Sequence, residues 1–467
     1  MPAIKATGAY IPYYRLKREE ITRAWGVSGR GEKAVANYDE DSLTLAVEAG
    51  RDCLKGIARE TIDGLYFATT TPPYAEKQCA ATIAAALDLR NDIFTADFTD
   101  SLRAGTGALR AAVDAVKAGS AKNVLVIAAD CRIGSPGSDF EHKFGDGAAA
   151  LLVNAQGNVV IEANAVFNNE IIDQWRTSKQ EFTRMWEDRF VYTKGYLETI
   201  KEATGAFLKQ LSGEDFAKVI LSADDTRRHQ EGSRVLKLAP SKVPNPLLDT
   251  VGNTGTASAL LMLVAALEEV RANDRLLLIN YGDGCDLYTF RVQEDPSFPA
   301  GRRGVKGYLS SKKYLKSYED YLRIRKVMDV EGGRRRPPVV SSAVAVHRDR
   351  DMIYRLHAHE CTSCGRAFFP PQRVCLYCRA KDQYKKVPIA EEKGTLFTFC
   401  KDLVSQSLDP PVVISVVNLE RGLRFYGAMT DRDLDKIELG MPIELTFRKM
   451  SDAEGFFNYF WKCRPIR

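Results

Sequence analysis

Apolar and polar positions follow one pattern over roughly the first 295 residues and another over the rest of the chain. In the first part, short apolar runs alternate with stretches in which apolar positions recur every three or four residues. The runs predict buried strands, the wider spacing predicts helices, and their alternation is typical of an α/β fold. We expect strands over 124–129, 148–153, 218–221 and 276–280, and a helix over 41–54.

Two kinds of glycine-rich motif each occur twice in this first part. GTG at 105–107 and GTA at 255–257 each open a predicted helix that leads to a predicted strand. FGDG at 144–147 and YGDG at 281–284 each enter a further apolar strand. This order of motifs predicts two halves of like topology. The halves are expected to span residues 1–165 and 166–295.

The next segment is a basic connector. From Arg302 to Arg336 the chain has 12 Lys or Arg against 4 Asp or Glu residues, whereas the whole chain has a net charge of only +5. One basic segment on a slightly acidic body argues against a nucleic-acid-binding protein. It indicates a solvated linker or a local anionic partner. Within it we expect a short helix around 314–326, followed by the motif GGRRRPP.

Four of the ten cysteines form two closely spaced pairs. Two residues separate Cys361 from Cys364 and Cys375 from Cys378, and ten residues lie between the pairs. Two such CxxC turns present four thiolates in a tetrahedron, the geometry that Zn²⁺ prefers. We predict a structural zinc ion, because four thiolates leave the metal no open position for chemistry.

Beyond these cysteines, five short segments alternate apolar and polar residues, which predicts strands with one buried face. Five short strands after a zinc ribbon suggest a small barrel of the OB type. The expected C-terminal organisation is the basic connector over 296–345, a zinc ribbon over 346–388 and an OB-fold domain over 389–467.

Composition excludes two classes of protein. The chain is 45% hydrophobic and 27% charged, which is too apolar for a largely disordered chain. Its longest nearly apolar run, 257–267, falls well short of the roughly 20 residues that a membrane span needs. The N-terminus lacks the apolar stretch of a signal peptide. We therefore expect a cytoplasmic protein without a membrane partner.

Three segments of the first part resemble the thiolase superfamily: VLVIAADCRIGSPGSDFEHKFGDGAAALLV at 124–153, AGTGAL at 104–109 and DTVGNTGTASALL at 249–261. The resemblance is strongest to hydroxymethylglutaryl-CoA synthase, and ketoacyl synthase III is more distant. It implies a duplicated five-layer fold over about residues 1–295. The tail from about Tyr314, with RLHAHECTSCGRAFFPPQRVCLYC, resembles the zinc-ribbon/OB family that accompanies thiolases acting on acyl-CoA.

The resemblance breaks at the expected active site. The family's nucleophilic Cys falls at Leu102, which cannot form a thioester, and its general-acid Glu falls at Thr70. The expected His falls near 222–225, which reads SADD, so only Asn253 of the expected catalytic set is retained. These losses favour a non-covalent reaction of aldol type beside a CoA thioester, which needs a proton shuttle and enolate stabilisation but no acyl-enzyme. The alternatives are a catalytically silent CoA-binding subunit, and Claisen condensation or acyl transfer with a relocated nucleophile.

We select Asn253, His142, Ser101 and Asp225 as the candidate catalytic residues. Asn253 is carried over from the family and is able to donate to a thioester oxygen or hold a water. Histidine is the side chain that ordinarily titrates near neutral pH, which makes His142 an acid–base candidate. Ser101 lies beside the lost nucleophile, and Asp225 lies on the loop of the missing His. Ordinary structural roles compete with each assignment, namely a turn, a backbone-bonded His, and helix caps for Ser101 and Asp225. Further candidates are Tyr74, Asp100, Asp224, His229, Tyr281 and Cys285.

Coenzyme A is expected as part of the substrate, and its phosphates are expected to meet either the basic connector or the OB domain. The resemblance implies a homodimer, with a thiolase-type partner subunit as a further possibility. Residues 168–204 are rich in Trp, Phe, Tyr and Met, and we expect this stretch to line the acyl pocket. The sequence leaves the acyl chain and the direction of reaction open.

Overall fold

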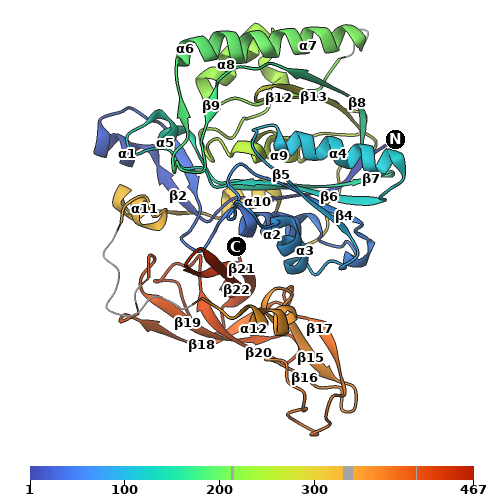
Figure 1. Ribbon diagram of the computed structural model, residues 1–467, viewed down its shortest axis with the longest axis vertical. Helices are drawn as coiled ribbons and strands as arrows, with labels where there is room; N and C mark the ends of the chain where they lie inside the picture. The colour runs from blue at the N-terminus through green and yellow to red at the C-terminus, as the bar shows by residue number, and fades with distance from the viewer. Residues whose placement is uncertain (212–214, 330–339, 406) are drawn as a thin grey trace. The chain divides into compact units, whose positions relative to one another are not determined.

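The computed structural model describes residues 1–211, 215–329, 340–405 and 407–467 (Figure 1). It divides into two compact units. The GGRRRPP motif lies outside the described residues. None of the helices within the described ranges is both long enough and apolar enough to cross a membrane. The first unit comprises Met1–Ala36, Asp41–Ala84 and Leu89–Tyr321, and the second comprises Asn37–Glu40, Ala85–Asp88 and Leu322–Arg467.

A nine-stranded sheet in the order β11-β12-β13-β8-β1-β7-β6-β4-β5 organises the first unit. Its two ends repeat one pairing pattern. In one half β4 and β6 are parallel, β6 and β7 antiparallel, and β7 and β1 antiparallel. In the other half the same pattern joins β11, β12, β13 and β8. The strands are β1 Ala3–Tyr10, β4 Gly64–Ala68, β5 Phe94–Phe98, β6 Asn123–Asp130, β7 Gly147–Asn154, β8 Val159–Asn168, β11 Lys218–Leu221, β12 Arg275–Tyr281 and β13 Gly284–Val292.

Four helices complete a layered arrangement around the two halves of this sheet (Figure 1). Helix α2 packs on β1, β6 and β7, and α7 packs on β8, β12 and β13. Helices α4 and α9 contact each other between the two sheet halves. The predicted α/β fold with duplicated halves is therefore confirmed, and so are the four predicted strands. The helices span Ser42–Cys53 (α2), Ala104–Ala118 (α4), Glu198–Gln210 (α7) and Ser258–Leu267 (α9).

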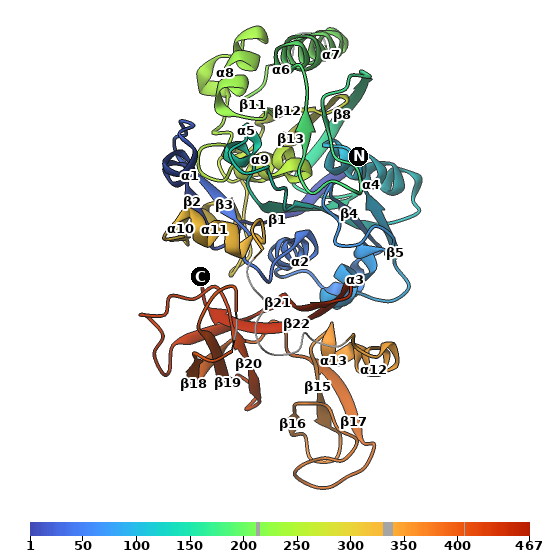
Figure 2. The same cartoon turned by 60° about the vertical axis from the view of Figure 1, so that its left-hand side comes forward.

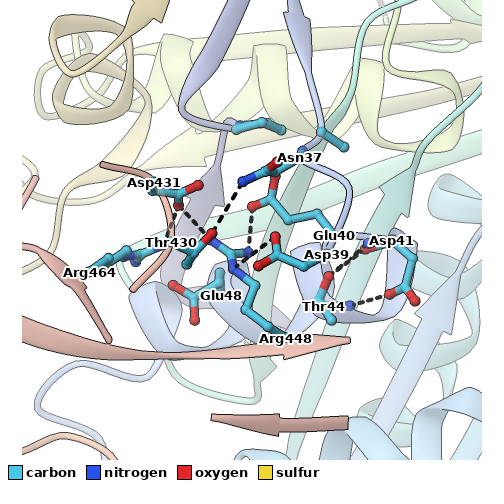
Figure 3. Close-up of polar contacts among 12 residues, drawn as sticks. Asn37, Asp39, Glu40, Asp41, Thr44, Glu48, Thr430, Asp431, Arg448 and Arg464 are labelled. Carbon is cyan, nitrogen blue, oxygen red and sulfur yellow. Dashed lines mark hydrogen bonds and ion pairs between the residues drawn. The ribbon is translucent and has the colours of Figure 1, made fainter. Parts of the chain in front are cut away.

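The predicted helix over 41–54 is α2, and its start shows why the sequence folds this way. The Asp41 side chain accepts a hydrogen bond from the Thr44 backbone N–H at 2.9 Å, and the Thr44 hydroxyl accepts one from the Asp41 N–H at 2.9 Å (Figure 3). This capping box satisfies two backbone donors that a helix leaves free.

The connector begins inside the first unit, which extends to Tyr321. The short helix predicted around 314–326 is confirmed as α11, Tyr318–Ile324. Tyr314, the first residue of the predicted helix, instead belongs to β14, Lys313–Tyr314, which pairs with β2, Tyr14–Lys17. The other predicted domain boundaries stay predictions.

The second unit contains the two expected β structures (Figure 2). Strands β16, β15 and β17 form a three-stranded sheet that carries the paired cysteines. Strands β18-β19-β20-β22-β21 form a closed barrel in which β20 and β22 run parallel. This is a five-stranded barrel as predicted. The strands are β15 His357–Cys361, β16 Ala367–Phe368, β17 Tyr384–Pro388, β18 Gly394–Asp402, β19 Val412–Leu419, β20 Arg424–Met429, β21 Pro442–Ala453 and β22 Phe456–Pro465.

A buried ion cluster includes the segment Asn37–Glu40 in this second unit (Figure 3). Arg448 on β21 pairs with Glu40 and, at 2.6 Å, with Asp431. Lys462 on β22 donates to Asp39 at 2.8 Å. Although burial acts to raise it, the charges of Lys462 and Arg448 hold the pKa of Asp39 below its ordinary value. We define the ion cluster as four cations and four carboxylates, namely Arg448, Lys462, Arg464, Arg467, Asp39, Glu40, Asp431 and Glu444.

Candidate active site

A narrow cavity of about 20 Å³ lies within the first unit, where strands β11 and β12 end. The ends of these parallel strands are where α/β sheets usually bind ligands. Leu102, which precedes helix α4, and Asn253, which precedes helix α9, also line this cavity. A volume of this size holds about one water, so we call it the narrow cavity.

Asp224, after β11, is held by three side chains in this cavity. Gln174 donates to both of its carboxylate oxygens at 3.0 Å. Arg228 donates to Asp224 Oδ2 at 2.8 Å, and Asn253 donates to Oδ1 at 3.2 Å. The side-chain oxygen Oδ1 of Asn253 accepts a hydrogen bond from the Gly255 backbone N–H at 2.9 Å. This bond fixes the orientation of the Asn253 side-chain amide. One N–H of the Asn253 amide is thus left for a ligand.

Asp173 is the second carboxylate of the narrow cavity, and its environment is different. Asp173 is 8% exposed, and its oxygen Oδ1 has no hydrogen-bond partner among the described residues. Burial and the neighbouring Asp224 raise the pKa of Asp173 to about 7. The Tyr281 hydroxyl also lacks a partner of ordinary geometry in the part of the chain described, and burial and Asp173 raise the pKa of this phenol. Asp173 is therefore able to take up and release a proton near neutral pH, while the Tyr281 hydroxyl keeps its proton and is able to donate a hydrogen bond.

The start of α4 places Leu102, but not Ser101, in the wall of the narrow cavity. Ser101 Oγ donates to Asp283 at 3.1 Å and accepts the Arg103 backbone N–H at 3.2 Å. Cys285 is fully buried in the core around α7, and burial raises the pKa of its thiol. Among the described residues, no cysteine lines the narrow cavity.

A second, open cavity of about 810 Å³ shares Tyr192, Asp224 and Arg228 with the narrow one. We call it the open cavity. His142 and Asp225 line it, so the structure separates them from Asn253 among the sequence-derived candidates. His142 lies on α5, Asp139–Lys143. Burial, together with Lys33 and Arg18, lowers the pKa of His142.

Asp225 is the N-cap of α8, Thr226–Val235. Its carboxylate accepts the Arg228 backbone N–H at 2.8 Å and pairs with Lys143 at 3.2 Å. Burial acts to raise the pKa of Asp225, but the Arg228 N–H and Lys143 bring it below its ordinary value. This carboxylate is suited to accept hydrogen bonds and less suited to carry a proton at neutral pH.

Sequence reasoning missed Asp173 and Gln174 as site residues. Both come from the stretch 168–204 that we expected to line the acyl pocket. Val191, Tyr192 and Tyr196 of the same stretch also line the narrow cavity, from a π-helix over Val191–Leu197. A wide turn of this kind is frequent at functional sites. In the sequence, Asp173 and Gln174 stand out only as an acid next to an amide within an aromatic-rich stretch. Nothing in the sequence indicates which residues they contact.

The four paired cysteines of the second unit come together as predicted. The sulfur atoms of Cys361, Cys364, Cys375 and Cys378 all lie within 4.8 Å of one another. Backbone N–H donors, first that of Cys378, lower the pKa of Cys375 to about 6, which favours the thiolate. Four close thiolates fit a tetrahedral structural zinc ion.

Two family models match this chain. Residues 351–382 match the ChsH2 rubredoxin-like zinc ribbon domain. Residues 96–168 match the 3-oxoacyl-[acyl-carrier-protein] synthase III family.

Sequence relatives extend the likeness over most of the chain. The hydroxymethylglutaryl-CoA synthase of Thermococcus gammatolerans is 32% identical over 332 residues, which is 68% of this chain and 94% of that protein. That of Methanopyrus kandleri is 32% identical over 339 residues, 68% of this chain and 95% of the relative.

Solved structures show the same fold. An HMG-CoA synthase complexed with CoA has a TM-score of 0.63 at 20% identity, covering 73% of this chain and 94% of that one. The 3-oxoacyl-(acyl carrier protein) synthase III of Pseudomonas aeruginosa has a TM-score of 0.56 at 19% identity, covering 63% and 98%. The chain therefore belongs to the hydroxymethylglutaryl-CoA synthase family, with a thiolase-like fold and a C-terminal zinc ribbon of the ChsH2 type.

Proposed function

We propose that this chain is an enzyme that makes or breaks a carbon–carbon bond beside the thioester of an acyl-CoA, without forming an acyl-enzyme. Its relatives are hydroxymethylglutaryl-CoA synthases, and one structural neighbour binds CoA. The observation that carries the proposal is the pair of residues Leu102 and Asp173 in the lining of the narrow cavity. Leu102, before α4, cannot form an acyl-enzyme, and Asp173, with a pKa of about 7, is able to act as a general base.

Asp173 is the general base in the cleavage direction. It removes the proton of a β-hydroxyl group, and the O–H electron pair becomes the second bond of a new carbonyl group. The bond between the α and β carbons breaks, and its electrons pass to the thioester as an enolate. The α carbon then takes the proton back from Asp173. A base with a pKa near 7 suits both transfers, and the reverse sequence forms the bond.

Asn253 and Tyr281 stabilise the enolate oxygen. Asn253 retains one N–H for it, and the Tyr281 hydroxyl has no partner of ordinary geometry among the described residues. Donors fixed before the reaction lower the barrier because they need no reorganisation when charge develops. Asp224 positions the Asn253 amide and itself stays engaged with Gln174 and Arg228.

In this proposal the CoA portion occupies the open cavity, which shares the lining residues Tyr192, Asp224 and Arg228 with the narrow one. Arg30 and Arg189 line it, and guanidinium groups bind phosphate with paired hydrogen bonds. The zinc ion holds the ribbon together and takes no part in the reaction.

We also propose a homodimer formed through β5. This strand ends the nine-stranded sheet, and Phe94 on it is 66% exposed. An uncovered edge strand is a template for pairing with a second copy. Light scattering coupled to gel filtration tests this, and Phe94→Lys is expected to shift the wild-type dimer toward monomer.

The experiment that tests the activity incubates the purified chain with 3-hydroxyacyl-CoA and 3-ketoacyl-CoA esters. Product release is followed by liquid chromatography, and the intact protein mass is measured in parallel. Cleavage without a mass adduct supports the proposal. A stable acyl adduct overturns it in favour of a relocated nucleophile such as Ser101 or Cys285. Binding of CoA esters without turnover overturns it in favour of a silent subunit, the reading that the small volume of the narrow cavity favours.

A further inference from the structure

Arg132 is a buried cation without an ion pair in the described part of the chain. The residue lies two positions after β6 and is 6% exposed. Among the residues described, its guanidinium group makes one hydrogen bond, from Nη2 to the side-chain oxygen Oε1 of Gln174 at 2.6 Å, and Nη1 makes none. An unpaired buried charge is costly, so its presence needs an explanation.

The carboxylate closest to Arg132 in sequence, Asp130, is occupied by uncharged donors. Asp130 Oδ1 accepts hydrogen bonds from the hydroxyl groups of Thr69 and Thr71 at 2.9 Å. Its Oδ2 accepts the Thr256 backbone N–H at 2.8 Å and the Thr256 hydroxyl at 3.1 Å. Threonine donors therefore satisfy Asp130, and this carboxylate does not explain the buried cation.

Packing holds the Arg132 side chain in one position. Its guanidinium carbon Cζ lies 3.9 Å from the centre of the Phe144 ring, which is a cation–π contact. A Cβ atom at Gly255 would lie 2.9 Å from Arg132 Cδ, so glycine at this position leaves room for the arginine. Gly255 also donates its backbone N–H to the Asn253 side chain. The same turn thus shapes the place of Arg132 and the orientation of Asn253.

Gln174 connects Arg132 to the narrow cavity. It lies on β9, Gln174–Trp175, directly after Asp173. Its Oε1 accepts from Arg132, whereas its Nε2 donates to both oxygens of Asp224 at 3.0 Å. A guanidinium group has only donors and an ionised carboxylate only acceptors, so the opposite orientation of this amide would place like groups against each other on both sides. Arg132 therefore fixes the orientation in which Gln174 donates to Asp224.

Hydrogen-bond donors gather on one of the two carboxylates of the narrow cavity. Asp224 accepts from three side chains, whereas Asp173 Oδ1 has no partner in the part of the chain that the structure describes. Two neighbouring negative charges disfavour each other, which favours one proton on the pair. Donors favour the ionised form of a carboxylate, so this proton belongs to Asp173. The pKa of Asp173, which burial and Asp224 raise to about 7, agrees with this placement.

The charged and titratable groups that face these two carboxylates come from several elements. The cations among them favour ionised carboxylates, and the acids oppose a second negative charge. Burial lowers the pKa of Arg132, and Asp130, Asp224 and Asp173 act to raise it, so the Arg132 charge acts on both carboxylates of the cavity. The groups are Arg132 after β6, Tyr196 on the π-helix, Asp225 and Arg228 at the start of α8, Tyr281 at the end of β12 and Asp283 after it.

We propose that Arg132 is a positioning residue, which fixes the Gln174 amide so that Asp224 stays ionised and Asp173 alone carries the exchangeable proton. Without Arg132, the amide is free to turn its oxygen toward Asp224, where it accepts a hydrogen bond from the protonated acid. The two carboxylates then share the proton and hold it more tightly, since one positive charge fewer faces them. The consequence for catalysis rests on the proposed function, whereas the placement of the proton does not.

Infrared titration of the full chain tests the placement, because the C=O stretch of a protonated carboxyl group is resolved from that of a carboxylate. The wild type is expected to show a carboxyl signal that titrates near pH 7 and is lost in Asp173→Asn. In Arg132→Met the midpoint is expected to rise by about one pH unit. Gln174→Met keeps the cation but removes the amide, and a smaller rise is expected. This variant also serves if Arg132→Met folds poorly, as judged by its melting temperature.

Two further variants separate the role of Arg132 from a general loss of charge. Arg132→Lys keeps a charged donor for Gln174 and is expected to restore the wild-type midpoint. Arg176→Met is the matched control, since Arg176 follows the same strand, is exposed, and donates to the Thr70 carbonyl at 2.9 Å. Its charge is screened by solvent, so the midpoint is expected to stay that of the wild type.

The pH profile of cleavage gives a readout that a merely structural role would not move. With the midpoint one unit higher, kcat of Arg132→Met is expected to be about fivefold lower than that of the wild type at pH 7, yet within about twofold at pH 9. A loss of packing alone would lower kcat by the same factor at both pH values, and this result would overturn the role of Arg132.

The outcomes separate the two proposals. A wild-type midpoint in Arg132→Met or in Gln174→Met, or an equal shift in Arg176→Met, overturns the role of Arg132, while turnover by the wild type still supports the proposed function. A titration that depends on Arg132, without turnover of any ester, supports the role of Arg132 and overturns the proposed function. A carboxyl signal near pH 7 that persists in Asp173→Asn overturns both, because the proton is then not on Asp173.

Discussion

Two buried carboxylates, Asp173 in the first unit and Asp39 in the second, respond to burial in opposite ways. Burial raises the pKa of Asp173 to about 7, and Asp224 beside it adds to the rise. Burial acts in the same direction on Asp39, but Lys462 and Arg448 bring the pKa of Asp39 below its ordinary value. The difference lies in the partners, since both residues are less than a tenth exposed.

This contrast separates a structural charge cluster from a reactive site. The ion cluster has four cations for four carboxylates, and each carboxylate has a cationic partner. In the narrow cavity, Asp224 takes up the donors nearby and Asp173 is left with an unpaired oxygen. Pairs of acids whose environments separate their pKa values are typical of acid–base sites.

The largest expected effect comes from removing the cation that the ion cluster shares. Arg448→Met leaves Glu40 and Asp431 buried with fewer partners, and we expect a loss of about 3–5 kcal/mol in the free energy of unfolding. Urea unfolding measures this. Arg424→Met is the control, because Arg424 is exposed on β20 and contacts Asn418 and the ring of Phe397. If the two variants have the same free energy of unfolding, the ion pairs of Arg448 in the ion cluster do not contribute to the stability of the fold.

The second effect concerns activity. Asp173→Asn removes the proposed base, and we expect kcat to fall by at least about 10²-fold. Asp114→Asn is its control, since Asp114 lies on the exposed side of α4 and pairs with Arg110. Wild-type kcat in Asp173→Asn would exclude Asp173 from the reaction.

The pH dependence of the wild type sharpens the same point. A base with a pKa of about 7 is protonated below that pH. The rate of cleavage is therefore expected to rise about tenfold per pH unit up to pH 7 and to level off above it. Asp173→Glu is expected to shift the pH at which this rise levels off. A cleavage rate that does not change between pH 5 and 8 would contradict the role of Asp173 as the general base.

The fold was largely predictable from the sequence, whereas the site was predictable only in part. Apolar runs fixed the strands because burial of a whole run is a local property, and the CxxC pairs fixed the zinc site because its ligands are close in sequence. Asp173 needed the tertiary structure, because its pKa is raised first by burial and then by Asp224, which lies some 50 residues away in sequence. The segment Asn37–Glu40 was unexpected in the second unit for the same reason, since its partner Arg448 lies near the other end of the chain.

The pH dependence of stability is expected to have opposite signs at the two carboxylates, because the pKa of Asp173 is raised on folding and that of Asp39 is lowered. The unfolded Asp173 loses its proton near pH 4 and the folded one near pH 7, so folding loses stability as the pH rises between these values. Asp173→Asn is therefore expected to raise the melting temperature at pH 8. Asp39 contributes stability above pH 4 and loses it as the pH falls through its lowered folded value, so Asp39→Asn is expected to lower the melting temperature at pH 7. Shifts of the same sign would contradict the comparison.

The smallest effect tests a third carboxylate, Asp225, which stands between the two cases. Asp225 is only partly buried, whereas Asp173 is buried, and a helix N–H and Lys143 satisfy Asp225 as cations satisfy Asp39. Asp225→Ala removes the cap of α8 and is expected to cost about 1 kcal/mol. Asp225→Asn keeps a capping oxygen and is expected to cost less, with kcat close to that of the wild type. A fall of about 10²-fold in kcat for Asp225→Asn would make Asp225 the acid–base group, since a lost helix cap alone lowers stability and leaves the rate of the folded enzyme unchanged.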